Sequence, residues 1–399
     1  MKNFNRFMTA AAMLAAVSFS SCDNEDEDGD VTPQPQSVVL NGSISEDMTL
    51  KAGDEIIIAG GVHVKAGATL TIEPGVVVKN DLDESVAYLL IERGAKIMAE
   101  GTADAPIVFT SDKEERGSWG GIIINGYAPI NRGTEATAEV GDVMYGGSDA
   151  DDNSGVIKYV RVEFGGNQIN DEKEHNGFTF NGVGRGTEVH HLESYMGSDD
   201  GFEFFGGTVE ANYLVSIGSG DDCFDWTYGW AGKGSNWFAQ QMEGAGDRGI
   251  EADNNSKDRA ASPYSNPTLE NIVLIANEGS ESDGMKLREG TKANINNVYI
   301  KNFKDAIEIE HNETLDNLAN GEIILTNIKA EGQTNDLKYK GTILSEEDGY
   351  SAEEVEQSKL DAEPYETKAA DNAAKISVDA NVTLSTSLSS FEWAAGWTR

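Results

Sequence analysis

Three acidic side chains recur at one position of a short repeated motif, and they are the residues most able to do chemistry. The motif is a turn residue, a small residue and an apolar–polar–apolar triplet, whose polar position holds Glu203, Asp225 and Glu251 in three copies. In strands stacked side by side, these residues would stand about 4.8 Å apart on one face. Carboxylates about 5 Å apart repel by roughly 3 kcal/mol at an effective dielectric constant of about 20. Such a row needs relief from solvent, raised pKa values or a bound cation.

Calcium is the cation that this row would suit, because Ca²⁺ accepts several carboxylate oxygens in flexible geometry. Asp199 and Asp221 precede the turn residues of two motif copies and would project beside the row. The turn residues themselves, such as Asp200 and Asp222, have a structural explanation, because an Asp side chain bonds the backbone two residues on. The alternative to a Ca²⁺ or ligand site is a hydrated acidic face.

A second acidic segment resembles a calcium loop more distantly. Asp149, Asp151 and Asn153 alternate ahead of Gly155. The glycine comes one residue late for an EF-hand, and no glutamate follows at the closing position. These three residues are secondary metal-ligand candidates.

Aromatic residues cluster after the third copy of the motif. Trp226 occupies an apolar position of the motif, which predicts that it is buried. Tyr228, Trp230 and Trp237 have no such assignment and would form a stacking platform for a sugar or another flat ligand. The alternative is a lid packed on the flank of the fold.

The spacing of the motif predicts the elements that carry these residues. Alternating apolar residues are typical of half-buried strands, and a turn residue at each start indicates a chain that keeps bending. Most neighbouring copies begin about 22 residues apart, which matches one coil of a parallel β-helix. The two apolar positions of each copy would then form inward columns. The copies are Asn176–Phe180, Asp200–Phe204, Asp222–Trp226, Arg248–Ala252, Asp283–Leu287 and Asp305–Ile309.

Several phrases of the sequence resemble a known superfamily. They are Gly101–Ser111, Ser118–Asn125, Ser154–Phe164, Asp221–Trp230 and Trp393–Thr398. With them the chain resembles right-handed parallel β-helix proteins of the pectate-lyase-like superfamily. The resemblance is greatest to surface proteins of Bacteroidota and marine bacteria whose function is unknown. It implies the fold and says little about activity.

We expect the β-helix to span residues 37–344, with an amino-terminal cap and insertions near residues 141–153 and 227–268. Residues 345–399 would cover the other end. Ser351 and Glu354 have capping-box spacing and predict a short polar helix that ends before Pro364.

The resemblance also implies which residues to consider for catalysis. Polysaccharide lyases of this superfamily join acidic calcium ligands to an Arg or Lys base, and Arg248, Lys286 and Arg288 lie near the acidic row. The alternative is that these residues are counter-charges for the acids. The sequence carries no HExxH motif, nucleophile elbow or P-loop, and no organic cofactor is expected.

The amino terminus predicts export and a lipid anchor. Residues 1–21 combine two basic residues with an apolar stretch, as in a secretory signal peptide, and Cys22 would be lipidated after cleavage. Residues 22–36 read as an acidic tether. An acidic run after a lipidated cysteine resembles the signal that sends Bacteroidota lipoproteins to the outer face of the outer membrane. The alternative is an ordinary signal peptide.

Charge limits the class of partner. The formal net charge of −39 disfavours nucleic acid and anionic membrane surfaces, so contact with the membrane is expected only through the lipid anchor. We therefore expect a cell-surface lipoprotein whose rigid flank binds a glycan, a nutrient or an outer-membrane transporter, with Ca²⁺ as the expected ion. The alternative functions are a Ca²⁺-dependent polysaccharide lyase or glycoside hydrolase, or a purely structural role.

Overall fold

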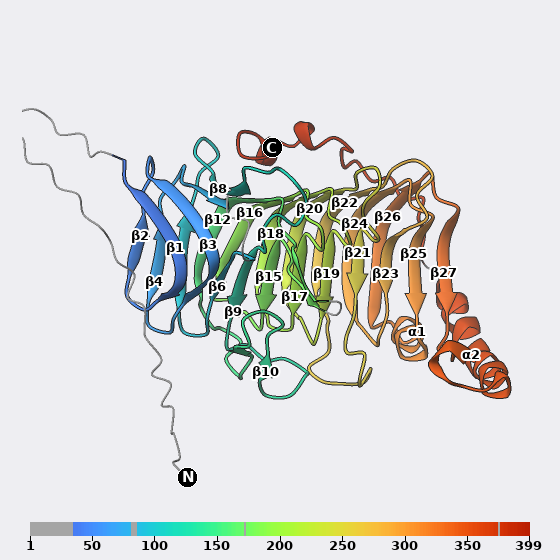
Figure 1. Cartoon of the computed structure of the whole chain (residues 1–399). Coiled ribbons are helices and arrows are strands. Elements are labelled where there is room, and N and C mark those ends of the chain that lie inside the picture. The colour runs from blue at the N-terminus through green and yellow to red at the C-terminus, as the bar shows by residue number, and fades with distance from the viewer. Residues whose placement is uncertain (1–34, 81–85, 171–172, 374–375) are drawn as a thin grey trace, which may run out of the picture. The chain divides into compact units, whose positions relative to one another are not determined.

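The computed structural model describes residues 35–80, 86–170, 173–373 and 376–399. The chain divides into Met1–Pro35 and Gln36–Arg399, and the second unit is described here by itself. The predicted signal peptide, the predicted lipidation site Cys22 and nearly all of the predicted tether lie outside the described residues. Within Gln36–Arg399, parallel strands stack coil upon coil, which confirms the predicted parallel β-helix (Figure 1).

Two faces of the β-helix are built from the same long strands, and each strand bends in the middle so that one half lies in each face. Each long strand pairs in parallel with the next through both of its halves. They are β12 (Gly155–Glu163), β16 (Glu188–Tyr195), β18 (Glu210–Ile217), β20 (Lys233–Gln240), β22 (Thr268–Ile275), β24 (Ala293–Lys301) and β26 (Ile323–Glu331).

Separate strands continue these two faces toward the amino terminus. The strands β2 (Met48–Leu50), β4 (Thr69–Ile72) and β7 (Lys96–Glu100) lead to the first half of β12. The strands β5 (Val77–Asn80) and β8 (Ile107–Ser111) lead to its second half. At the start, β1 (Ser37–Ile44) and β3 (Glu55–Val64) are long and pair with each other.

The remaining stack carries the repeated motif, and we call it the motif face. Its order follows from the parallel pairs between successive strands. It comprises β6 (Tyr88–Ile91), β9 (Ile122–Asn125), β15 (Phe178–Asn181), β17 (Phe202–Phe205), β19 (Phe224–Thr227), β21 (Ile250–Ala252), β23 (Asp283–Leu287), β25 (Asp305–Glu310) and β27 (Asn335–Lys340).

A single residue in the left-handed region bends each long strand. In the seven long strands from β12 to β26 its φ lies between 50° and 61°, a conformation that Asn adopts more readily than most residues. In the early coils this corner carries stacked rings, with 4.3 Å between the centroids of Tyr159 and His191 and again between His191 and Tyr213. The row is Tyr159, His191, Tyr213, Asn236, Asn271, Asn297 and Asn327.

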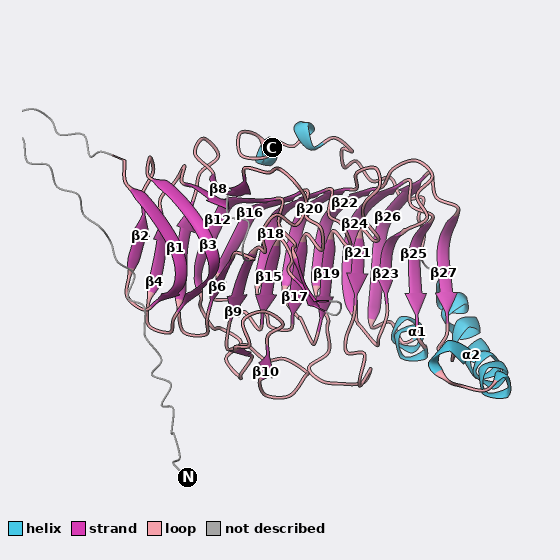
Figure 2. Cartoon of the chain, viewed as in Figure 1, coloured by secondary structure: helices cyan, strands magenta, loops and turns pink. Residues whose placement is uncertain are grey.

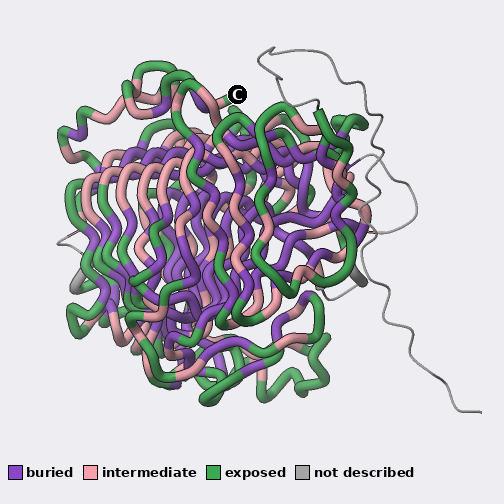
Figure 3. The backbone as a smooth tube through the Cα atoms, turned by 90° about the vertical axis from the view of Figure 1, so that its left-hand side faces the viewer, coloured by how far each residue is buried: buried purple, intermediate pink, exposed green. Residues whose placement is uncertain are grey.

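The core is the interior of the coil, as the motif predicts. Phe178, Phe202 and Phe224 are fully buried and stack in a column with centroid spacings of 5.1 and 5.6 Å. The second inward column, from Phe180 to Ile309, is also buried. Figure 3 shows this buried interior inside more exposed outer turns.

Short elements decorate the stack (Figure 2). The antiparallel pair β10 (Ala136–Thr137) and β11 (Met144–Tyr145) belongs to an excursion after β9, and β13 (Gln168–Asn170) pairs with β14 (Lys173–Glu174). The predicted insertion near 227–268 is too wide, because β20 and β21 lie in it as regular coil strands. The excursion there is confined to residues 253–267.

One helix lies between β25 and β26, and a second helix and a returning tail follow β27 (Asn335–Lys340). The helices are α1 (Asn312–Ala319) and α2 (Ala352–Ala373), with 3-10 turns η1 (Glu346–Asp348), η2 (Leu388–Ser390) and η3 (Glu392–Ala394). Ser351 and Glu354 form the predicted capping box. The expected end before Pro364 is wrong, because α2 continues through this proline and buries Ala369 beyond it.

The tail of the chain runs back over the long strands (Figure 1). Val378 and Ala380 hydrogen-bond β26, Phe391 contacts Phe238, and Trp397 contacts Tyr159. We call residues 376–399 the return strap. It covers an outward apolar row that includes Val215, Phe238, Val273 and Tyr299.

Candidate functional site

The acidic row predicted from the repeat lies in register on the motif face. Glu203 pairs with Asp225, and Asp225 pairs with Glu251. The same outward position continues through Lys286, Glu308 and Lys338 in the later coils. The row therefore has an acidic first part and a second part in which the sign alternates.

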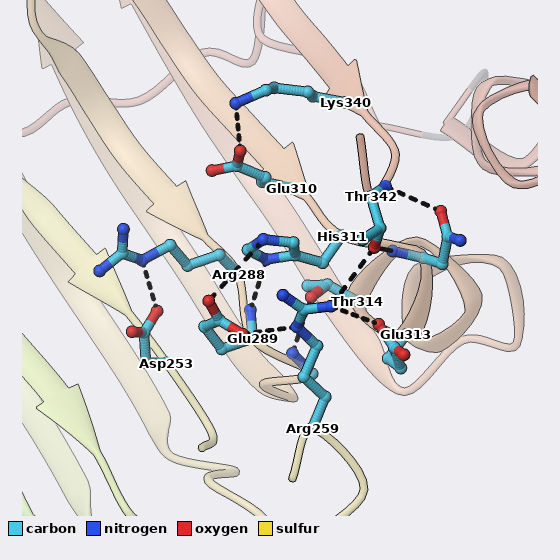
Figure 4. Close-up of polar contacts among 12 residues, drawn as sticks. Asp253, Arg259, Arg288, Glu289, Glu310, His311, Glu313, Thr314, Lys340 and Thr342 are labelled. Carbon is cyan, nitrogen blue, oxygen red and sulfur yellow. Dashed lines mark hydrogen bonds and ion pairs between the residues drawn. The ribbon is translucent and has the colours of Figure 1, made fainter. Parts of the chain in front are cut away.

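The second part of the row is neutralised by lysines. Lys286 Nζ lies 3.3 Å from a carboxylate oxygen of Glu308 and 3.0 Å from one of Glu310. Lys338 also pairs with Glu308, and Lys340 pairs with Glu310 (Figure 4). Burial alone would raise the pKa of Glu310, but its two lysine partners outweigh burial and lower that pKa to about 2.

The first part crowds its carboxylates instead. Oxygens of Asp200, Glu203 and Asp225 all lie within 4.8 Å of one another, and we call these three residues the acid cluster. Asp225 Oδ1 is buried and has no hydrogen-bond partner among the described residues. No ion pair joins Glu203 or Asp225 to a basic side chain in the described chain.

Crowding and burial act together on these acids. Burial, and then the charges of Glu203 and Glu251, raise the pKa of Asp225 well above its usual range. Burial, and then the charges of Glu139 and Asp199, do the same for Glu203. The structure thus holds acids whose charged forms lack compensation, which is the arrangement that a divalent cation relieves.

Turn acids serve the backbone and the cluster at once. Asp200 Oδ1 accepts the backbone N–H of Asp222 at 2.8 Å, and Asp222 Oδ1 accepts that of Arg248 at 2.6 Å. These bonds join one coil to the next and are not the expected bonds to the backbone two residues on, so the turn-forming explanation stays a prediction. Asp200 nevertheless also belongs to the acid cluster, which the sequence had not indicated.

Asp199 and Asp221 lie beside the cluster, as the motif predicts. One oxygen from each lies within 4.8 Å of Asp200, and Asp221 also groups with Asp222 and Asp247. Burial and a hydrogen bond with the Glu174 carboxyl raise the pKa of Asp199 to about 9.

Glu251 is in register but is compensated by arginines. Arg248 Nη1 lies 2.7 Å from Glu251 Oε1, and Arg288 pairs with Oε2. Arg288 Nε also donates to Asp253 at 2.9 Å (Figure 4). Glu251 therefore marks the boundary between the two parts of the row and is a weaker metal-ligand candidate than Glu203 and Asp225.

The candidate catalytic bases are all engaged in ion pairs. Arg248 pairs with Asp222, Asp247 and Glu251, and Lys286 and Arg288 pair as described above. Burial lowers the pKa of Lys286, but the carboxylates of Glu310 and Glu308 outweigh it and raise that pKa. A general base must lose its proton near the working pH, so this geometry fits counter-charges better than bases.

The predicted aromatic platform is wrong for two of its three members. Trp230 and Trp237 are 0% and 1% exposed, and their indole N–H groups donate to Val209 and Ala211 carbonyls. Trp237 occupies an inward position of β20, in register with Leu214, so its ring fills the core. Tyr228 is half-buried over the ring of Phe205, with 5.9 Å between centroids, and stays a candidate.

The second acidic segment is occupied by local bonds. Asp149 Oδ1 accepts the N–H of Asp151, and Asn153 Oδ1 accepts that of Gly155. Asp151 pairs with Arg185 at 3.3 Å. Within the described residues these side chains do not belong to a group of acids close enough to share a metal ion, so they are weaker metal-ligand candidates than the acid cluster.

A pocket next to the acid cluster is a feature that the sequence did not indicate. The excursion after β9 brings Val140 against Leu90 and Ile123 of the motif face, and the β13–β14 hairpin ends at Glu174. Asn176 links the pocket to the cluster, because its Nδ2 donates to Glu203 at 2.5 Å. The lining residues are Ile123, Glu139, Val140, Glu174, Asn176, Thr179, Asn181 and Phe205.

Among the described residues, no helix has the length and apolar character needed to cross a membrane. Searches of curated proteins and of solved structures found no match to the chain. A family model described as a pectate-lyase-like β-helix domain matches residues 42–398, which is most of the chain. Together with the stacked parallel strands, this match shows that the chain belongs to the family of pectate-lyase-like β-helix domains.

Proposed function

We propose that this protein is a cell-surface lipoprotein whose acid cluster binds Ca²⁺ and whose motif face binds a glycan or nutrient beside that ion. The observation that carries the proposal is the acid cluster of Asp200, Glu203 and Asp225. Two oxygens bound to one Ca²⁺, each at 2.3–2.6 Å, lie at most about 5 Å apart. The oxygens of the acid cluster meet that limit, since they all lie within 4.8 Å of one another.

The unpaired oxygen of Asp225 supports the same proposal. A buried carboxylate oxygen without a donor is costly, since buried polar atoms nearly always have partners. A cation would satisfy this oxygen and cancel the repulsion between neighbouring acids. Asp199 and Asp221 would extend the acidic surroundings toward solvent.

Thermal melting tests the ion. We expect Ca²⁺ to raise the melting temperature relative to chelator, because a ligand at 100 times its dissociation constant stabilises the native state by about 2.7 kcal/mol. Asp225→Asn should abolish the shift, while Glu270→Gln, which changes an exposed acid of β22, should keep it. An unchanged melting temperature at millimolar Ca²⁺ would refute the proposed ion.

Binding, without turnover, is the role that we propose for the motif face. The raised pKa of Lys286 and the ion pairs of Arg248 and Arg288 favour counter-charges over lyase or hydrolase bases. Incubation with acidic and neutral polysaccharides plus Ca²⁺ should give neither unsaturated products nor new reducing ends. Turnover that disappears in Lys286→Ala or Arg288→Ala would overturn this part of the proposal.

We also propose a Bacteroidota-type anchor on the outer face of the outer membrane, through lipidated Cys22 and the acidic tether. Whole-cell labelling should detect the protein at the surface and lose it in Cys22→Ala. An outer-membrane transporter is the partner that we propose at the outer face of the outer membrane. Retention of the Cys22→Ala protein at the cell surface would contradict the anchor.

A further inference from the structure

Two adjacent histidines meet at the corner of β16, on the long strands and apart from the motif face. Consecutive residues of a strand normally face opposite sides of a sheet. The left-handed φ of 54° at His191 interrupts this alternation, and His191 Nδ1 lies 2.7 Å from His190 Nδ1. The two rings meet at an interplanar angle of 81°. We call these two residues the histidine pair.

Neighbouring coils hold one ring of the pair and leave the other accessible. His191 is stacked between Tyr159 and Tyr213, with 4.3 Å between ring centroids on each side. His190 lies toward solvent, with 27% of its side chain exposed, and its Nε2 is 3.1 Å from a carboxylate oxygen of Glu188. An ion in solution therefore reaches the pair from the His190 side.

The hydrogen bonds assign the protons of the pair. An ionised carboxylate only accepts, so His190 carries its proton on Nε2, toward Glu188, and its Nδ1 keeps a lone pair. The contact between the rings then requires that His191 Nδ1 donates to His190 Nδ1. Burial, and then the charge of His190, lower the pKa of His191 to about 4, so no second proton competes with a metal ion at neutral pH. Moving the His191 proton to Nε2 leaves a lone pair on both Nδ1 atoms.

The separation of these two nitrogens suits a single metal ion. Bonds from imidazole nitrogen to such ions are about 2.0–2.1 Å long. Two such bonds at a right angle place the nitrogens about 2.9 Å apart, and a tetrahedral angle places them about 3.3 Å apart. The 2.7 Å separation is closer to the right-angled arrangement, which Cu²⁺ and Ni²⁺ adopt. Glu188 takes the place of the carboxylate that commonly orients a metal-bound histidine through its other nitrogen.

Charge around the pair favours a cation. Lys158 lies beside His190 in the register of β12 with β16. Its Nζ is 2.9 Å from an oxygen of Glu100 and 3.6 Å from one of Glu188, so two carboxylates face one ammonium group. These three groups together carry a net negative charge. A divalent ion at the pair therefore meets no uncompensated positive charge from Lys158.

The remaining histidines lack such an arrangement, and all five in the chain are described. His63 uses both ring nitrogens, with Glu92 and with Tyr88. His175 is 2% exposed, and His311 Nδ1 accepts the backbone N–H of the preceding coil. The pair at β16 is thus the place where two imidazole nitrogens lie close enough to bind one ion.

We propose that the histidine pair binds a divalent transition-metal ion, with Cu²⁺ bound most tightly. The affinity of nitrogen sites rises along the first-row series to Cu²⁺ and falls again at Zn²⁺, and the narrow separation favours the same ion. The chain supplies two ligands, and the other positions are open to water or to a group of a bound molecule. This site goes beyond the proposed Ca²⁺ binding, because Ca²⁺ takes oxygen ligands and does not compete for imidazole.

Titration with Cu²⁺, followed by electron paramagnetic resonance, tests the proposal. The full chain is prepared without a polyhistidine tag and is kept in millimolar Ca²⁺, so that carboxylate sites are already occupied. We expect one tightly bound Cu²⁺ per chain, with coupling to two imidazole nitrogens in its spectrum. Ni²⁺ and Zn²⁺ should bind more weakly. A bound Cu²⁺ without imidazole coupling, or tighter binding of Zn²⁺ than of Cu²⁺, would overturn the proposal.

His191→Asn is a well-matched variant, because the chain itself places Asn at the same corner in later coils, at Asn236, Asn271, Asn297 and Asn327. We expect His191→Asn and His190→Gln each to weaken Cu²⁺ binding by at least about tenfold, which corresponds to 1.4 kcal/mol. His311→Asn is the control, since it replaces another histidine of positive φ, and it should leave Cu²⁺ affinity unchanged. Unchanged affinity in either variant of the pair would overturn the proposal. If His191→Asn fails to fold, His190→Gln, on the solvent side, decides the test.

Crossed measurements separate this site from the acid cluster. His191→Asn should keep the Ca²⁺-dependent shift in melting temperature, and Asp225→Asn should keep Cu²⁺ binding. If Ca²⁺ has no effect on melting while Cu²⁺ still binds through two imidazoles, the proposed function falls and the copper site stands. If Asp225→Asn abolishes Cu²⁺ binding, the copper lies at the acid cluster and the present proposal is overturned.

Discussion

The two parts of the outward row on the motif face share a backbone and differ in charge. From β17 to β21 the row reads Glu203, Asp225 and Glu251, whereas from β23 to β27 it reads Lys286, Glu308 and Lys338. Like charges directly opposite one another destabilise a sheet, and opposite charges stabilise it. The later coils show that the fold accommodates an alternating row. Crowded acids in the earlier coils are therefore not imposed by the architecture.

The acids in and beside the two parts also differ in pKa. Beside the alternating part, two lysines lower the pKa of Glu310 to about 2. Beside the acidic part, burial and neighbouring carboxyls raise the pKa of Asp199 to about 9, and they raise that of Asp225, within the row, well above its usual range. This contrast separates a structural ladder from a candidate binding site on a single face.

The largest expected effect comes from breaking the alternating part. Lys286→Ala should lower the free energy of unfolding by about 3 kcal/mol, because it removes a cation from the buried acid Glu308 and from Glu310. Urea denaturation measures the change. Lys233→Ala, which removes an exposed partner of Glu210, should cost less than about 1 kcal/mol. Similar losses for both variants would remove the distinction between ladder and surface pair.

A smaller effect is expected from the pH dependence of the same part. The pKa of Glu310 is lowered from 4.5 to about 2 in the fold, so its stabilising effect is present above about pH 4.5 and is lost as the pH falls toward 2. Glu310→Gln should therefore be about 2 kcal/mol less stable than the natural protein at pH 6, and the difference should vanish near pH 2. Unfolding free energies measured across this range give the result, and a constant difference would contradict the assigned shift.

Replacing an acid in the acidic part should stabilise the fold, whereas the changes in the alternating part destabilise it. Without Ca²⁺, Asp225→Asn should raise the unfolding free energy by about 1 kcal/mol at neutral pH, because burial and the nearby Glu203 and Glu251 make the acid unfavourable in the folded state, and the neutral amide avoids that cost. Asp305→Asn provides the comparison in the alternating part, where Asp305 pairs with Lys338 at 2.9 Å, and should destabilise. Chemical denaturation in chelator measures both. Destabilisation by both substitutions would mean that the two parts respond alike.

The smallest effect concerns the rim of the cluster. Asp221 is exposed, so Asp221→Asn should reduce Ca²⁺ stabilisation by only about 0.5 kcal/mol. The Ca²⁺-dependent shift in melting temperature is the measure, with Asp225→Asn as the reference for complete loss. If Asp221→Asn abolished the Ca²⁺-dependent shift completely, the ion would be centred on the turn acids and not on Asp225.

The repeat in the sequence predicts the motif face well and the other faces poorly. Phe202 and Phe224 are 22 residues apart and pair as expected, because stacking translates a fixed period into a fixed register. The prediction that Trp237 stacks on a ligand is wrong because Trp237 lies on a long strand, outside the motif from which inward positions are assigned. Its burial depends on the register of β20 with β18 and β22, which its local sequence does not reveal.

The sequence also does not predict those features of the site that depend on residues outside the repeated motif. Arg288 lies two residues after Lys286, and only its side-chain direction reveals that it reaches back to Glu251 and Asp253. The pocket exists because residues of the excursion after β9 pack on Leu90 and Ile123. The repeat predicts neighbours within a stack, but it carries no information on where an excursion returns.

The return strap changes how such a stack should come apart. In a solenoid each coil contacts only its neighbours, so end coils can fray independently. Here the strap bridges to Lys329 of β26 through Asp379, and Arg399 bonds Glu163 of β12 and Glu193 of β16. The strap thus bonds to coils that are distant along the axis. The coils between these contacts should therefore unfold as a single cooperative unit rather than one by one.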